Sequence, residues 1–132
     1  MQSFSILLLL LISLFVVIAQ QQEREHAKRI NDRFGKLIMA KDRKGLNSLF
    51  QMFFAYTVCN SATMTRDQFV NELLSFKSPV TFVHHVVEAK FANGVLEMRS
   101  FYKIQGKPLT IVFRVRPVGS NWQIISGKKE CA

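Results

Sequence analysis

Negative charge is scarce in this sequence, in which nine Asp and Glu residues stand against 18 Lys and Arg and give a formal net charge of +9. No charged side chain lies in the first 19 residues, so the excess belongs to the rest of the chain. That remainder has the size of one ordinary domain, which excludes two domains. Its apolar residues, including most of the 12 Phe, exclude a disordered basic tail. The positive charge is therefore a surface property of one folded unit.

Metal-binding and glycosylation motifs are also missing. The only two cysteines, Cys59 and Cys131, belong to no Cys-x-x-Cys or Cys/His cluster, so no structural zinc, other metal or cofactor is expected. There is no Asn-x-Ser/Thr motif, and N-glycosylation is not expected.

A long apolar run occupies the beginning of the chain. It covers residues 6–19 and ends with Val17 and Ala19 at the −3 and −1 positions of a cleavage site. The pattern predicts a signal peptide over residues 1–19, because a membrane-spanning helix needs about 20 apolar residues. An uncleaved anchor is the alternative, since no basic side chain precedes the run. Residues 20–132 are thus predicted to form a secreted, extracellular domain.

The two cysteines become interpretable once secretion is predicted. An oxidising compartment favours one intramolecular disulfide between Cys59 and Cys131. Two unpaired or intermolecular thiols are the alternative.

Helical periodicity marks the first half of the domain. Residues 23–41 carry an apolar stripe with basic residues on the other faces, which predicts an amphipathic helix. Asp42 is predicted to cap a short second helix whose stripe extends to Phe53. A strand is predicted over residues 54–59, and the capping-box pattern of residues 65–68 opens a third helix.

After Pro79 the apolar period changes to two, as in strands. Asn93-Gly94 and Gln105-Gly106 predict tight hairpin turns. The resulting register pairs Lys90 with Glu97 on one face and His85 with Tyr102 on the other. The predicted inner face of these strands comprises Val83, His85, Val87, Ala89, Phe91, Leu96, Met98, Ser100, Tyr102, Ile104, Leu109, Ile111, Phe113 and Val115. A last strand is predicted over residues 122–127.

This order of elements resembles the nuclear transport factor 2-like (cystatin-like) superfamily over about residues 22–131. Residues 42–50, Asp-Arg-Lys-Gly-Leu-Asn-Ser-Leu-Phe, are similar to that family's Asp-x-x-x-Leu-x-x-Leu-Phe turn. Phe69 with Leu73, and residues 122–124, also stand where the family has such residues. The secreted form with two cysteines resembles small nematode-type members. The resemblance implies an α+β fold in which three helices pack in a strongly curved, mainly antiparallel sheet, forming a cone with an apolar pocket.

Enzymes of the family use a carboxylate base and a hydroxyl inside the cone. The resemblance places Phe34 at the position of the isomerase's catalytic Tyr and Thr57-Val58 at that of its base. No Asp or Glu lies on the predicted inner face, so we expect binding rather than catalysis. One alternative is an isomerase- or cyclase-like enzyme that uses His85 and Tyr102. A cystatin-like inhibitor ranks last, because the Gln-x-Val-x-Gly loop is absent.

The predicted pocket would hold a small apolar ligand. Its residues are Phe34, Tyr56, His85, Met98, Ser100, Tyr102 and Phe113. The His85–Tyr102 pair either orients a ligand or is a hydrogen-bonded core pair, and His84 is expected to point outward.

Surface partners follow from charge and from the outer sheet face. The stretch from Arg24 to Lys44 holds eight positive and three negative side chains, which either attract an anionic surface or acidic partner or form a solvated face. Nucleic acid is not expected for a secreted chain. A homodimer through the outer sheet face is an open expectation, because an apolar patch is predicted there. Its residues are Val86, Phe101, Val112 and Ile125.

Overall fold

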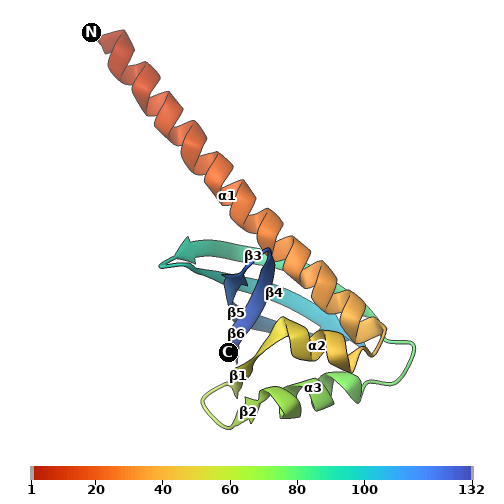
Figure 1. Ribbon diagram of the computed structural model, residues 1–132. Helices are drawn as coiled ribbons and strands as arrows, with labels where there is room; N and C mark the ends of the chain where they lie inside the picture. The colour runs from red at the N-terminus through yellow and green to blue at the C-terminus, as the bar shows by residue number, and fades with distance from the viewer. Residues whose placement is uncertain (1, 132) are drawn as a thin grey trace.

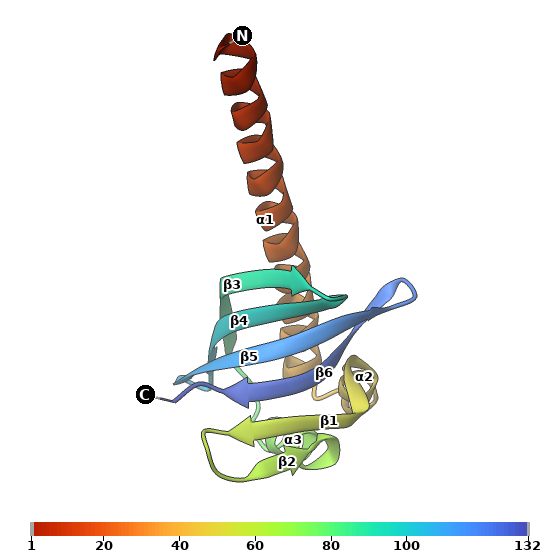
Figure 2. The same ribbon diagram turned by 90° about the vertical axis from the view of Figure 1, so that its left-hand side faces the viewer.

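The computed structural model describes residues 2–131. The elements are α1 (Gln2–Met39), α2 (Arg43–Leu49), β1 (Phe50–Val58), β2 (Thr63–Thr65), α3 (Arg66–Leu74), β3 (Phe82–Ala92), β4 (Val95–Ile104), β5 (Lys107–Val118) and β6 (Asn121–Lys129). The six strands form one sheet in the order β2-β1-β6-β5-β4-β3, antiparallel except for the β1–β6 pair. All three helices lie on one side of the curved sheet, and its other side is open (Figures 1 and 2). The predicted α+β fold is confirmed.

Helix α1 is longer than the predicted segment 23–41, because it continues without a break into the apolar run. Its first half projects past the β3 edge of the sheet, and the apolar side chains there are exposed (Figure 2). This half has the length and composition to cross a membrane, a property that a signal sequence shares. Within the described residues, Ala27 is the first member of the buried core. The core of the domain therefore does not use residues 2–19.

The link between α2 and β1 differs from the prediction. The Asp42 side chain caps α2 as expected, accepting a hydrogen bond from the Gly45 amide at 2.9 Å. However, the chain becomes extended at Phe50, where pairing with β6 begins, so Phe53 lies on a strand and is 84 % exposed. The prediction of Phe53 on a helical stripe was wrong, because strand pairing outweighs continuation of a two-turn helix.

Helix α3 begins where the capping box predicts. The Thr65 hydroxyl accepts from the Gln68 amide at 3.3 Å, and the Gln68 side chain accepts from the Thr65 amide at 2.9 Å. Together the two bonds satisfy donors that the first helical turn leaves free.

Both predicted hairpin turns are present. Gly94 and Gly106 have φ values of 75° and 76°, a region that favours glycine. Around the second turn the predicted pairing of Tyr102 with Leu109 is confirmed, and Glu97 lies between Lys90 and Arg114 as expected.

Strand β3 contains a bulge that the sequence pattern does not reveal. Pairing with β4 shifts between Val86 and Glu88, so that Val86 faces Ser100 and His84 faces Tyr102. One extra residue reverses the alternation of side chains for the rest of the strand. The predicted inward orientation of Val83, His85 and Val87 was therefore wrong, and these three side chains are exposed.

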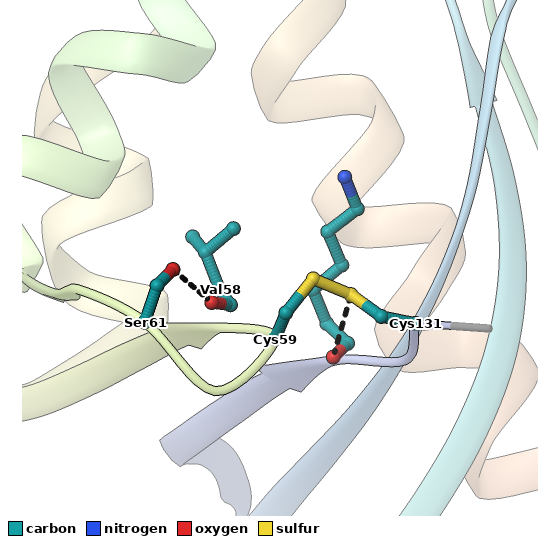
Figure 3. Close-up of a disulfide and its surroundings, with 5 residues drawn as sticks. Val58, Cys59, Ser61 and Cys131 are labelled. Carbon is teal, nitrogen blue, oxygen red and sulfur yellow. Dashed lines mark hydrogen bonds between the residues drawn. A yellow bond between two sulfur atoms is a disulfide. The ribbon is translucent and has the colours of Figure 1, made fainter.

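The predicted disulfide between Cys59 and Cys131 is confirmed (Figure 3). It joins the turn after β1 to the chain end after β6, with the two Cα atoms 5.5 Å apart. In the same turn, the Ser61 hydroxyl donates to the Val58 carbonyl at 2.6 Å. The disulfide thus links the carboxyl ends of the parallel strands β1 and β6.

Candidate functional site

Aromatic rings fill the interior between α1 and the sheet. The Phe34 ring, 1 % exposed, meets four rings edge to face. The ring centroids lie 5.6–5.8 Å from Phe34, and the four partners are Phe50, Phe82, Tyr102 and Phe113. Such T-shaped contacts are favourable aromatic geometry. The predicted apolar pocket is therefore a packed core, because its own side chains occupy the centre of the cone.

The other residues of the predicted pocket belong to the same core, with the exception of His85. Met98 and Ser100 are fully buried on β4. Tyr56 is 5 % exposed, and its ring centroid lies 4.4 Å from that of Phe69. Burial raises the pKa of Tyr56 to about 12. The prediction that these side chains face inward is confirmed, but they contact one another rather than line a cavity.

A buried polar network links α1 to β4. Asn31, with no exposed surface, accepts from the Tyr102 hydroxyl at 2.5 Å and donates to the Ser100 hydroxyl at 2.9 Å. Burial raises the pKa of Tyr102 well above its ordinary value, although hydrogen bonds to Ser100 and Asn31 oppose the shift. The sequence reasoning missed Asn31. Its position four residues after Ala27 and seven before Ile38, on the apolar stripe, was the available signal.

The predicted pair of His85 and Tyr102 does not exist. His85 pairs with Phe101 on the other face of the sheet and is exposed. The bulge instead turns His84 toward α1, contrary to the prediction that it points outward. The Arg24 guanidinium supports this bulge by donating to the carbonyls of Val86 and Val87 at 3.2 and 3.0 Å.

His84 forms a contact with Asp32 of α1, in which Nε2 lies 2.7 Å from Oδ1. The two residues line a hollow of 270 Å³ at the surface. The other ring nitrogen of His84, Nδ1, is buried and has no hydrogen-bond partner within residues 2–131. A general base needs a nitrogen that can reach substrate. In His84, Nε2 contacts Asp32 and Nδ1 is buried, so neither nitrogen is free to reach a substrate. The His84–Asp32 contact instead joins β3 to α1.

The comparison with known proteins identifies the family. The family model of the NTF2-like domain matches residues 24–132 of this chain. The chain belongs to the NTF2-like family.

Similar solved structures include NTF2-like proteins and a domain with a cystatin-like fold. An NTF2-like protein of unknown function from Silicibacter pomeroyi DSS-3 has a TM-score of 0.70 at 11 % identity, covering 79 % of this chain and 91 % of that chain. An NTF2-like protein of unknown function from Shewanella baltica OS155 has a TM-score of 0.68 at 11 % identity, covering 83 % and 93 %. A domain of unknown function with a cystatin-like fold from Nostoc punctiforme PCC 73102 has a TM-score of 0.65 at 8 % identity, covering 84 % and 79 %. No curated protein matches the sequence. Identities this low show the fold alone.

The described residues place no Asp, Glu, His, Lys or Arg side chain in the buried interior of this NTF2-like domain. The buried polar groups among the described residues are Asn31 and Ser100, which do not titrate, and the hydroxyls of Tyr56 and Tyr102, whose pKa values burial raises. Phe34, which the resemblance places at the position of a catalytic Tyr, is a core ring. Within residues 2–131, no group of three His, Cys, Asp or Glu is arranged to hold a metal.

The strongest chemical feature on the surface of the NTF2-like domain is a basic face on α1 and α2. We define the basic face as the eight exposed Lys and Arg side chains between residues 24 and 44, which are Arg24, Lys28, Arg29, Arg33, Lys36, Lys41, Arg43 and Lys44. None of them forms an ion pair with an acid within residues 2–131. Two of the three neighbouring acids have other partners, since Asp32 contacts His84 and Asp42 caps α2.

The open face of the sheet carries mixed charge. Arg99 pairs with Glu130 at 3.0 Å, which adds to the cross-strand pairing of opposite charges. Val86, expected on this face, lies inside and is 7 % exposed because of the bulge. Phe101, Val112 and Ile125 remain partly exposed. The apolar patch predicted for a homodimer therefore loses Val86, while the bulge leaves Val83 and Val87 exposed.

Proposed function

We propose that this protein is a secreted, non-catalytic binding domain whose basic face recognises a sulfated polysaccharide. The observation that carries the proposal is the set of eight exposed cations without an acidic partner in the described residues. The apolar leader and the disulfide are compatible with an extracellular location, where such polyanions occur.

The layout of the cations favours a linear polyanion. From Arg24 to Lys36 the basic residues extend along roughly 18 Å of helix, at about 1.5 Å per residue. Unpaired charges in such a row raise the local concentration of an extended anion and speed its binding.

A lipid surface fits this face less well. Membrane-bound helices place large apolar side chains beside their cations. Between residues 20 and 51, Met39 is the one large apolar side chain that is strongly exposed. The basic face therefore offers charge without an apolar surface to insert.

A small apolar ligand inside the cone fits less well too. It would have to displace Phe34 from the four rings that surround it. An enzymatic role based on a histidine and Tyr102 fits less well, because the second nitrogen of His84 is buried and the exposed His85 lies on the other face of the sheet from Tyr102.

Heparin chromatography of the secreted protein tests the proposal. The double variant Lys28→Glu, Lys36→Glu reverses two charges on the basic face. The matched control, Lys103→Glu, Lys107→Glu, makes the same change at exposed positions of the β4–β5 hairpin. We expect retention at 0.15 M salt, roughly physiological, and elution of the first variant at clearly lower salt than the control. Equal shifts for both variants, or no retention of the unaltered protein, would refute the proposal.

A further inference from the structure

A cleft opens between α1 and the β5–β6 hairpin, beside the end of α2. It consists of two adjoining hollows of 140 and 200 Å³, and Arg33, Asn121 and Trp122 line both. The first hollow adds Arg29, and the second adds Ser48 and Gln123. Together they lie just above the lower limit of about 300 Å³ for small-molecule sites. We call this feature the Arg–Trp cleft.

The Arg–Trp cleft is built to receive an anion. Arg29 and Arg33 are four residues apart on α1, so their charges are neighbours and repel each other. Neither forms an ion pair in the part of the chain that the structure describes, and neither hollow is lined by Asp or Glu. A sulfate or carboxylate between them would relieve the repulsion and accept charge-assisted hydrogen bonds from both guanidinium groups.

Trp122 gives the cleft a flat apolar wall. Its ring is held by two neighbours, His26 of α1 at 5.1 Å between centroids and Phe91 of β3 at 6.1 Å. The indole is partly exposed and lines both hollows. An aromatic side chain fixed in this way can pack against the face of a ring in the ligand.

Neutral polar groups complete the lining. Ser48, Asn121 and Gln123 contribute a hydroxyl and two amide side chains to the lining of the two hollows. Hydroxyl and amide groups of this kind donate to and accept from sugar hydroxyls. The lining residues therefore suit a ligand that combines an anionic group, a flat-packing ring and several hydroxyl groups.

We propose that the Arg–Trp cleft binds one anionic pyranose ring of a sulfated polysaccharide. The sulfate or carboxylate would lie between Arg29 and Arg33, and the ring would pack on Trp122. This inference rests on the proposed function: the basic face attracts the polyanion, and the cleft holds one of its rings.

The single tryptophan makes the cleft directly observable. Trp122 is the only Trp in the chain, so its fluorescence reports on this site and not on the rest of the basic face. The probe is a sulfated disaccharide of glucosamine and uronic acid, titrated into the secreted protein. We expect a saturable change in emission, which desulfated disaccharide and sodium sulfate do not produce. Arg33→Gln should weaken binding at least tenfold, because a charge-assisted bond is lost. The matched control Arg114→Gln lies on β5, outside both the cleft and the basic face, and should change the affinity less than twofold.

The two proposals fail in distinguishable ways. Retention on heparin without any change in Trp122 emission overturns the cleft site and leaves the proposed function intact. Equal weakening by Arg33→Gln and Arg114→Gln also overturns the cleft site, as does an equal response to sodium sulfate or to desulfated disaccharide. Loss of both heparin retention and the emission change overturns both.

Discussion

Phe34 is the side chain on which the packed interior depends most. Phe34→Ala removes a ring that is 1 % exposed and contacts four other rings. Truncating a buried Phe to Ala lowers the free energy of unfolding by about 3–5 kcal/mol. We expect a loss toward the upper end of this range, because each edge-to-face aromatic pair adds about 0.5–1.5 kcal/mol of stability beyond the contribution of its buried area. Since each kcal/mol of lost stability lowers the thermal unfolding midpoint by roughly 4 °C, the midpoint of this variant should fall by about 12–20 °C.

Phe53→Ala is the matched control for this change. It removes the same atoms from a ring that is 84 % exposed on β1. Surface substitutions of this kind change stability by about 0.5 kcal/mol or less. The difference between the two variants therefore measures packing of the interior and not the chemistry of the substitution.

Urea unfolding and thermal melting of both variants provide the assay. The cavity left by Phe34→Ala should also bind benzene, as engineered apolar cavities do, so benzene should raise the midpoint of this variant only. A loss below about 1 kcal/mol for Phe34→Ala, or an equal benzene response in the unaltered protein, would show that the interior is an open pocket and would refute the packed core.

Three further perturbations test other features of the fold. Asn31→Ala leaves the buried Tyr102 hydroxyl without its acceptor and should cost about 1–3 kcal/mol in urea unfolding; an additive loss when Tyr102→Phe is combined with it would contradict the network. Absorbance titration should show no phenolate step near pH 10, because burial raises the pKa of both tyrosines, that of Tyr56 to about 12. The unfolded chain ionises first, so stability is full below pH 10 and falls as the pH rises toward 12; a titration midpoint at 10 in the folded protein would contradict the burial. Replacing Cys59 and Cys131 together by Ser opens a bond between residues 72 positions apart and should lower stability by up to about 4 kcal/mol in urea; an unchanged midpoint would exclude a stabilising role.

Membership of the NTF2-like family leaves the role of this domain open, because one fold hosts many functions. The resemblance implies an apolar pocket in the cone, whereas here the cone is filled by its own side chains. We therefore base both proposals on the surface of the domain, on the basic face and the Arg–Trp cleft.

Local signals in the sequence determined much of the fold. The Asp42 cap, the Thr65 capping box and the two glycine turns act over a few residues, so their geometry follows directly from the side chains. The disulfide was predictable because the chain has only two cysteines, and the predicted secretion favours their pairing with each other.

Only the tertiary structure decided the features on which the proposed function rests. The bulge that exchanges His84 and His85 inserts one residue into a run whose alternation looks regular, and Arg24, more than 60 residues away, supports it. The Arg–Trp cleft joins α1 to a hairpin near the other end of the chain. Whether the cone is open or filled depends on how rings from five elements pack, and packing between distant segments leaves no local pattern in a sequence.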